Sequence, residues 1–97
     1  MPAYVVARLC IENEGAFARY REMVGPTIEA YGGRYLVRGN RFEVVEGSDR
    51  VDRIVILEFP DFETAKRWHE SDQYEPVKAL RESCAETQMI IAEGLGS

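Results

Sequence analysis

Three segments of the chain are apolar on both faces of the strand that each is expected to form. Residues 4–11 hold seven apolar side chains in eight, residues 54–59 hold five in six, and residues 88–92 hold four in five. A strand in an antiparallel sheet with one wet face should alternate apolar and polar residues. Because none of the three alternates, the sheet that they build must be covered on both faces.

The segments between these strands predict the rest of the fold. Apolar residues recur at three- and four-residue spacing from Phe17 to Tyr31, which predicts a helix that Asn13 caps and Pro26 kinks. Residues 39–40 predict a turn, and residues 71–72 predict a break between two helical segments. The further predicted elements are strands at 34–38, 41–46, 53–59 and 87–93, and helices at 62–70 and from 72 to about 84.

The resulting order is β-α-β-(β)-β-α-β, which is the ferredoxin-like, split βαβ arrangement of an α+β protein with an antiparallel sheet. The chain of 97 residues has the length of one ordinary domain. It contains no linker, repeat or low-complexity stretch, so we expect a single domain over residues 1–97.

The two-sided strands predict a partner for the sheet. Two helices can cover only one face of a four-stranded sheet, and a soluble monomer rarely exposes a large apolar patch. The simplest way to cover the second face is a second copy of the chain that packs sheet to sheet. We therefore expect a homodimer formed through the sheet face.

The charge of the chain argues against nucleic acid and membrane surfaces as partners. The net charge is −5, and the excess lies in residues 49–97, where eleven acidic residues meet six basic ones. Neutralising phosphates requires clustered Lys and Arg, and the sequence has no basic stripe. Its apolar runs also fall far short of the ~20 residues that cross a bilayer.

The two cysteines and the single histidine are too scattered for a metal centre. Cys10 and Cys84 lie 74 positions apart, and there is no CxxC pair. A structural zinc site needs about four clustered ligands. We expect two reduced cysteines, no metal and no cofactor. The cysteine usage and the lack of a signal-like start favour a cytoplasmic protein.

Two charges interrupt the apolar strands. Arg8 is the only charged residue in the first strand and Glu58 is the only one in the segment 54–59. If the two strands are parallel neighbours at the centre of the sheet, these residues lie at similar height, and a buried charge requires a partner. The pattern predicts an Arg8–Glu58 contact, either a structural ion pair or a polar anchor in a ligand cavity.

Five blocks of the sequence together resemble the domain-of-unknown-function 1330 family, in order and over nearly the whole chain. They are Pro-Ala-Tyr-Val-Val-Ala-Arg at 2–8, Tyr-Gly-Gly-Arg-Tyr-Leu-Val-Arg-Gly at 31–39, Val-Glu-Gly at 45–47, Ile-Leu-Glu-Phe-Pro at 56–60, and the helix with Tyr74, Lys78, Ala79 and Arg81. Asn40 and Asp72 depart from the family pattern, which has glycine and proline there.

The resemblance implies a dimeric α+β barrel, in which two ferredoxin-like sheets face each other and the helices lie outside. The wider superfamily includes cofactor-free oxygenases, isomerases, haem-degrading enzymes and chlorite dismutases. Their ligands often lie in a cleft between the sheet and the helices. The family itself implies no particular reaction.

Several side chains are candidates for a site in such a cleft. His69 titrates near neutral pH and follows Trp68, a pair that suits proton transfer or an aromatic ligand, although a boundary histidine has the same pattern. Arg38 ends a strand and is suited to a bidentate carboxylate contact or to a pair with Glu46. Arg81 has no acidic residue four positions before it, so its partner stays open.

Two functions remain open at this point. The first is a homodimer that binds a small organic ligand in a cleft lined by Arg8, Arg38, Glu58, Trp68 and His69, with His69 as the candidate catalytic residue of a cofactor-free isomerase or oxygenase. The alternative is a non-enzymatic dimerisation or interaction module without a ligand pocket.

Overall fold

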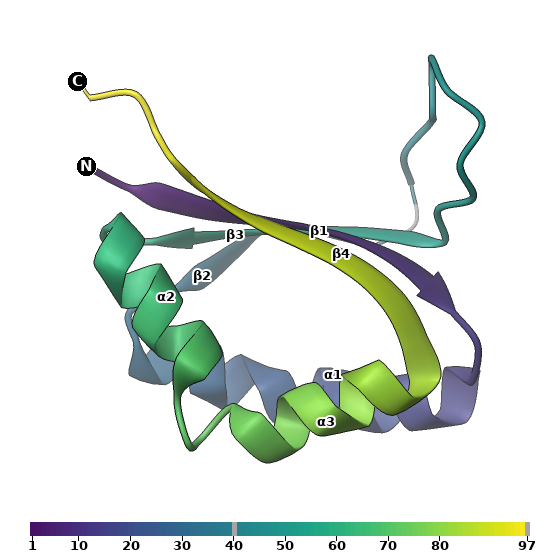
Figure 1. Ribbon diagram of the computed structural model, residues 1–97, viewed down its shortest axis with the longest axis horizontal. Helices are drawn as coiled ribbons and strands as arrows, with labels where there is room; N and C mark the ends of the chain where they lie inside the picture. Colours follow the sequence, from purple (N-terminus) through teal and green to yellow (C-terminus); the bar gives the residue numbers. More distant parts are fainter. Residues whose placement is uncertain (40, 97) are drawn as a thin grey trace.

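The computed structural model describes residues 1–39 and 41–96, and these form a four-stranded sheet with three helices on one face (Figure 1). The strands are β1 (Ala3–Ile11), β2 (Arg34–Gly39), β3 (Arg53–Phe59) and β4 (Ala85–Glu93), and the helices are α1 (Glu14–Ala30), α2 (Phe62–Glu70) and α3 (Glu75–Cys84). The strand order is β2-β3-β1-β4, and all neighbouring strands are antiparallel. The predicted α+β class and antiparallel sheet are confirmed.

Side-chain caps and one interhelical hydrogen bond fix the helices. Asn13 Oδ1 accepts a hydrogen bond from the Ala16 amide at 3.0 Å, as its capping role predicts. Helix α1 continues through Pro26 to Ala30. Thr27 lies on the buried side of α1, and its hydroxyl accepts a hydrogen bond from Trp68 Nε1 at 3.1 Å, which joins α1 to α2.

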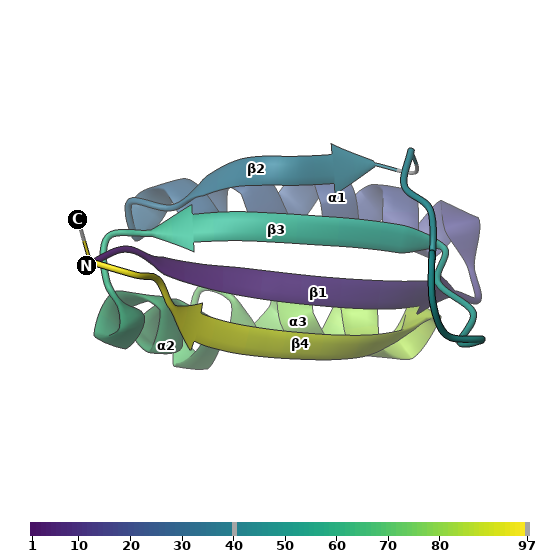
Figure 2. The ribbon, with the colours of Figure 1, turned by 90° about the horizontal axis from the view of Figure 1, so that it is seen from above.

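The segment 41–46, predicted as a strand, forms none. It belongs to the loop 41–52, which lies on the side of the sheet away from the helices and crosses the strand ends (Figure 2). A strand needs a hydrogen-bonded neighbour, and the segment finds none: β3 already has β2 on one edge and β1 on the other, and the segment does not pair with the outer edge of β2. Alternation of polar and apolar residues was therefore not enough to make this segment a strand.

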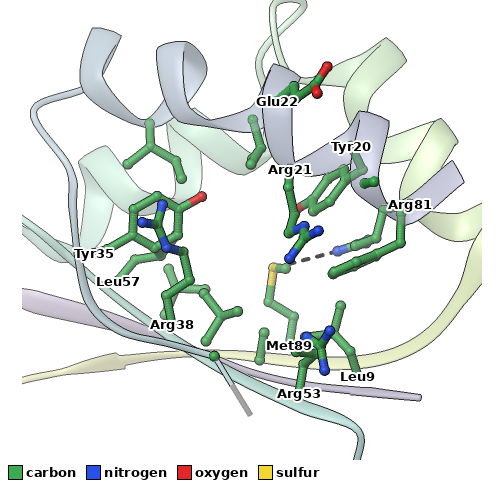
Figure 3. A pocket seen from close by; sticks show the side chains of 18 of the residues that line it. Leu9, Tyr20, Arg21, Glu22, Tyr35, Arg38, Arg53, Leu57, Arg81 and Met89 are labelled. Atoms are coloured by element: carbon green, nitrogen blue, oxygen red, sulfur yellow. Dashed lines mark hydrogen bonds between the residues drawn. The ribbon is translucent and has the colours of Figure 1, made fainter. Parts of the chain in front are cut away.

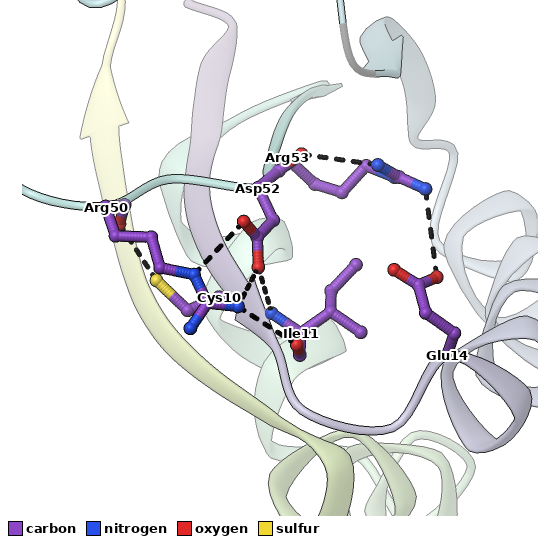
Figure 4. Close-up of polar contacts among 6 residues, drawn as sticks. All are labelled: Cys10, Ile11, Glu14, Arg50, Asp52 and Arg53. Atoms are coloured by element: carbon purple, nitrogen blue, oxygen red, sulfur yellow. Dashed lines mark hydrogen bonds and ion pairs between the residues drawn. The ribbon is translucent and has the colours of Figure 1, made fainter.

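The end of this loop is attached to β1 by a group of polar contacts (Figure 4). The Asp52 carboxylate accepts from the Ile11 amide at 2.8 Å and from Arg50 at 2.6 Å. The Asp52 amide donates to the Leu9 carbonyl at 2.8 Å, and Cys10 Sγ donates to the Arg50 carbonyl at 2.8 Å. These bonds hold the loop against the end of β1.

The predicted Arg8–Glu58 contact is wrong, because β1 and β3 are antiparallel rather than parallel. Arg8 lies opposite Ile54, and Glu58 lies opposite Tyr4. Arg8 and Glu58 are therefore four positions apart along the strands, or roughly 13 Å. In a split βαβ unit, the strand inserted between the two parallel strands runs antiparallel to both of them, so β3 is antiparallel to β1.

Each charge has another partner. Arg8 pairs with Asp49 of the loop at 3.6 Å, and Glu58 pairs with Arg34 of β2 at 2.8 Å. Both pairs lie at the sheet surface that the helices do not cover.

The two faces of the sheet are both apolar, as the strand pattern predicts. On the helix face, Val5, Ala7 and Leu9 of β1 are buried. On the other face, which we call the open face, the apolar side chains stay partly exposed. A row of four of them crosses all four strands, each residue directly opposite the next; this open-face row is Val37, Ile56, Val6 and Ile90. Ile90 is 51% exposed.

Candidate ligand-binding site

A cavity of about 450 Å³ lies between the helix face of the sheet and the helices (Figure 3). This volume falls in the range of small-molecule sites. The floor is a second row across all four strands, one residue along from the open-face row; this cavity row is Arg38, Val55, Ala7 and Met89. Ala7 is small, so the sheet and the helices do not fill the space above it.

The walls of the cavity are mainly apolar and aromatic, and they come from every helix. Helix α1 supplies Phe17, Tyr20, Val24 and Ile28, helix α2 supplies Trp68, and helix α3 supplies Arg81. Such a lining suits an organic molecule with a compact apolar body, held in place by a small number of polar groups.

Arg81 is the polar group at the inner end of this cavity. It lies on the buried stripe of α3 between Val77 and Cys84, and it is only 5% exposed. One of its terminal nitrogens donates to the Tyr74 hydroxyl at 3.5 Å and lies 4.0 Å from Met89 Sδ. Its Nε is buried without a hydrogen-bond partner, and across residues 1–39 and 41–96 it has no ion pair.

A buried guanidinium with no counter-ion is an expensive arrangement. Burying a charge costs several kcal/mol unless an opposite charge or hydrogen bonds compensate for it. A carboxylate is the group that best matches the geometry of a guanidinium. Arg81 therefore marks a place where an anion fits.

Two tyrosine hydroxyls lie beside this guanidinium. The hydroxyls of Tyr20 and Tyr74 are 3.3 Å apart, and the Tyr74 ring packs on Trp68 with centroids 4.3 Å apart. Burial raises the pKa of both tyrosines above the usual range, so both hydroxyls stay protonated at neutral pH. Of the two, Tyr20 lines the cavity, and its hydroxyl adds a neutral hydrogen-bonding group there.

The rim of the cavity is also basic. Arg21, Arg38 and Arg53 line it, and among the described lining residues Glu22 is the one carboxylate. Arg53 is paired with Glu14 at 3.9 Å. The cavity is thus electropositive in a chain whose net charge is −5.

Two of the five candidate residues from the sequence line this cavity, namely Arg38 and Trp68. Arg8 borders a separate hollow on the open face, and Glu58 lies on that face with Arg34. The imidazole of His69 lies outside the cavity lining, with its centroid 5.9 Å from that of the Tyr74 ring. The structure therefore does not gather the five into one site.

The sequence carried a signal for Arg81 but hardly any for Tyr35. Val77, Arg81 and Cys84 share one face of a helix, so a charge in that apolar stripe was visible. Tyr35 reaches the cavity by ordinary alternation in β2, since its neighbour Arg34 points to the open face, but a tyrosine in a short strand gives no sequence signal for a cavity.

Other kinds of site find no support in the described residues. They hold no group of three or more His, Cys, Asp or Glu side chains placed to bind a metal. The two cysteines are free thiols, as expected. Within residues 1–39 and 41–96, no helix is both long and apolar enough to span a membrane.

The model of one protein family, the domain of unknown function DUF1330, matches residues 2–95. The chain belongs to the DUF1330 family. No curated protein matches it. Membership of DUF1330 confirms the resemblance seen in the sequence, and the description of DUF1330 assigns no activity to it.

Solved structures similar to this DUF1330 chain share its fold. A protein of unknown function from Rhodopseudomonas palustris aligns with a TM-score of 0.81 at 17% identity, over 99% of this chain and 84% of that one. A dimeric ferredoxin-like protein of unknown function from Jannaschia sp. CCS1 gives a TM-score of 0.72 at 16% identity, over 97% and 100%. SnoaB, a cofactor-independent oxygenase from Streptomyces nogalater, gives 0.59 at 11% identity, over 99% and 95%.

Proposed function

We propose that this protein is a homodimer that binds a small organic acid in the cavity, with the carboxylate of the acid against Arg81. The observation that carries the proposal is the buried guanidinium of Arg81, with its unpartnered Nε and no carboxylate paired to it among the described residues. A carboxylate at this point would supply the missing charge and accept the missing hydrogen bond.

The lining defines the rest of the ligand. Ala7 and Val55 form an apolar floor, and Phe17 and Trp68 contribute aromatic walls. A volume of about 450 Å³ holds a body of one or two rings. An acid with an alicyclic or aromatic body fits this description, whereas acetate would leave the apolar lining without contacts.

The open face supports the homodimer. Its apolar row runs unbroken across the sheet, and the nearby charges Arg8 and Glu58 are already paired with Asp49 and Arg34. An apolar patch with its charges neutralised is complementary to itself, which suits a two-fold interface. The Jannaschia relative, described as dimeric, has the same fold.

Binding is better supported than turnover. SnoaB, described as a cofactor-independent oxygenase, shares the fold, and Arg81 with the Tyr20 hydroxyl would stabilise an oxyanion in a cofactor-free isomerase or oxygenase reaction. Such a reaction also needs a base, and Glu22, the one carboxylate of the described lining, is exposed. The alternative of an interaction module without a pocket is disfavoured by the cavity itself.

Calorimetry with a matched acid and amide tests the binding proposal. Cyclohexanecarboxylate should bind at one site per chain, and cyclohexanecarboxamide should bind about tenfold more weakly or not at all, because a charge-assisted bond contributes about 1.5–3 kcal/mol. Trp68, the single tryptophan and a lining residue, gives a second readout by fluorescence.

Arg81→Met should lower the affinity for the acid by about tenfold or more. Arg19→Gln, an exposed arginine on α1 outside the cavity, is the matched control and should bind as the parent does. Equal binding of acid and amide, or no saturable binding of either, would contradict the proposal. Native mass spectrometry of freshly purified protein would reveal a co-purified acid directly.

A further inference from the structure

An extra residue in β2 changes the face of the sheet to which Arg38 points. Tyr35 lies opposite Leu57 and Val37 lies opposite Ile56, so residues that are two positions apart in β2 face consecutive residues of β3. Leu36 is the additional residue of this β-bulge. In a regular strand, residues three apart point to opposite faces. The bulge places Tyr35 and Arg38 on the same, helix-facing side.

Bulges occur often beside sites where a side chain must be re-aimed. Here the bulge moves Arg38 into the cavity lining. Arg34 shows what the same strand does before the bulge, since its guanidinium lies on the open face and pairs with Glu58 at 2.8 Å. For Arg38, the described residues supply no such carboxylate.

We propose that the ligand is a dianion, with one carboxylate on Arg81 and a second anionic group on Arg38, at opposite ends of a compact apolar body. This inference rests on the proposed binding of an acid at Arg81 and goes further by naming the class of ligand. Arg38 would then fix the orientation of the ligand and favour diacids over monoacids.

The orientation of Arg38 suits a second anion. Its guanidinium carbon lies over the Tyr35 ring, 4.7 Å from the centroid, which is a cation–π geometry. A guanidinium has five N–H donors, so a contact with one ring leaves donors for a carboxylate. Burial raises the pKa of Tyr35 although Arg38 opposes this, so Tyr35 stays neutral and supplies no negative charge to Arg38.

The two arginines lie at opposite ends of the cavity row. Arg38 begins the row on β2, and Met89, which Arg81 contacts at 4.0 Å, ends it on β4. Figure 3 shows Arg38 and Tyr35 on one side of the cavity and Arg81 and Tyr20 on the other. Three strand spacings separate β2 from β4, or about 14 Å of backbone.

In this binding mode a ring with a carboxylate at each end bridges the space between Arg38 of β2 and Arg81 of α3, and Val55 and Ala7, the middle of the cavity row, lie under the ring. Succinate carries its two carboxylates closer together, and we expect it to reach one arginine at a time.

The test compares trans-cyclohexane-1,4-dicarboxylate with cyclohexanecarboxylate by calorimetry. The diacid should bind the parent protein about tenfold more tightly than the monoacid, because a second charged contact is formed. Arg38→Gln should abolish this advantage by weakening the diacid about tenfold, with a much smaller loss for the monoacid. Arg34→Gln, on the same strand but the opposite face, should keep the advantage, and succinate should show none.

The outcomes separate this inference from the proposed function. If the monoacid binds and the diacid binds no better, or if Arg38→Gln weakens both acids equally, the dianion proposal is wrong while acid binding at Arg81 stands. If neither acid binds the parent protein, both proposals fail. Because the comparison of acids uses the parent protein, it does not depend on the folding of any variant.

Discussion

Two rows of side chains cross the sheet, one on each face, and each strand contributes neighbouring residues to the two rows. The rows differ in the kind of partner that they need. The open-face row, Val37, Ile56, Val6 and Ile90, is apolar from edge to edge, and the nearby charges Arg8 and Glu58 are paired within the chain. The cavity row, Arg38, Val55, Ala7 and Met89, has an arginine without an ion pair among the described residues at each end, Arg38 itself and Arg81 beside Met89.

The two faces of the sheet therefore lack different partners. An apolar row with neutralised charges requires cover, which another copy of the same surface supplies. The cavity row ends at the buried cation Arg81, whose charge calls for an anion, and at the exposed cation Arg38, which offers a second place for one; another copy of the same cations supplies neither anion. The open face therefore points to self-association, and the cavity points to a small anionic ligand.

The largest effect is expected from a charge in the open-face row. Ile56→Asp places a carboxylate in the middle of the predicted interface, where a buried unpaired charge costs about 3–5 kcal/mol, so the dimer should weaken by more than about a hundredfold. Light scattering of the parent should give twice the 11.1 kDa of one chain, and the variant should give the mass of one chain. Ile56→Val is the control and should stay dimeric.

A parent protein that scatters as a single chain would contradict the interface. The same result in the parent and in Ile56→Asp would leave no role for the open-face row in association.

Filling the cavity row should remove binding with little loss of stability. Ala7→Leu adds carbons to the cavity floor, so binding of cyclohexanecarboxylate should be lost while the free energy of unfolding changes by less than about 1 kcal/mol. Ala65→Leu, at a fully buried position outside the cavity, should instead cost about 1–3 kcal/mol through overpacking. Urea unfolding and calorimetry measure the two effects; equal destabilisation of both variants would argue that no cavity exists.

Replacing the buried cation should stabilise the unliganded protein. Arg81→Met keeps an apolar stem of similar length and removes the desolvation cost of a charge without a counter-ion, so unfolding should become harder by about 1–2 kcal/mol. The same variant should bind the acid about tenfold more weakly or worse, so this substitution should raise stability and weaken binding at once. A loss of stability in urea unfolding would show that Arg81 has a structural partner instead.

The smallest effect is expected from His69, which lies outside the cavity lining. Burial lowers the pKa of His69, the positive charges of Lys78 and Arg81 lower it further, and Glu70 and Glu82 oppose them. The unfolded chain, with an ordinary histidine pKa near 6.5, therefore binds more protons just below that pH. Stability should decrease as the pH falls from about 7.5 through that window and then level off below the folded pKa.

His69→Gln should flatten this part of the pH dependence and leave acid binding unchanged. Unfolding of the parent and of the variant at several pH values from about 5.5 to 7.5 measures it. Identical slopes in the two proteins would show that His69 does not contribute.

The sequence was enough to predict the strands and helices that carry strong patterns. The apolar residues of 4–11 and 54–59 predicted two-sided strands, and Asn13 predicted the start of α1 at the right place. The prediction of a strand at 41–46 was wrong because alternation describes a single segment, whereas a strand forms only where the segment also pairs with a neighbour in the sheet.

The candidate site was less predictable, since it depends on register. Arg8 and Glu58 were placed together only because their strands were taken as parallel. Trp68 and Arg38 were identified from residue type, but the position of Arg38 in the cavity depends on the bulge at Leu36, which moves it across the sheet. Arg81 was visible as a charge within an apolar stripe, and its burial became clear only when α3 packed on the sheet.

The most direct test of the central claim is the Nε–H signal of Arg81 in a ¹⁵N-correlated NMR spectrum, assigned by its loss in Arg81→Met. Titration with cyclohexanecarboxylate should move this signal downfield and saturate at the affinity that calorimetry gives, because the unpartnered Nε–H would gain a charge-assisted hydrogen bond. A signal that does not move while the acid binds, or an acid that does not bind, would contradict the assignment of Arg81 as the carboxylate anchor.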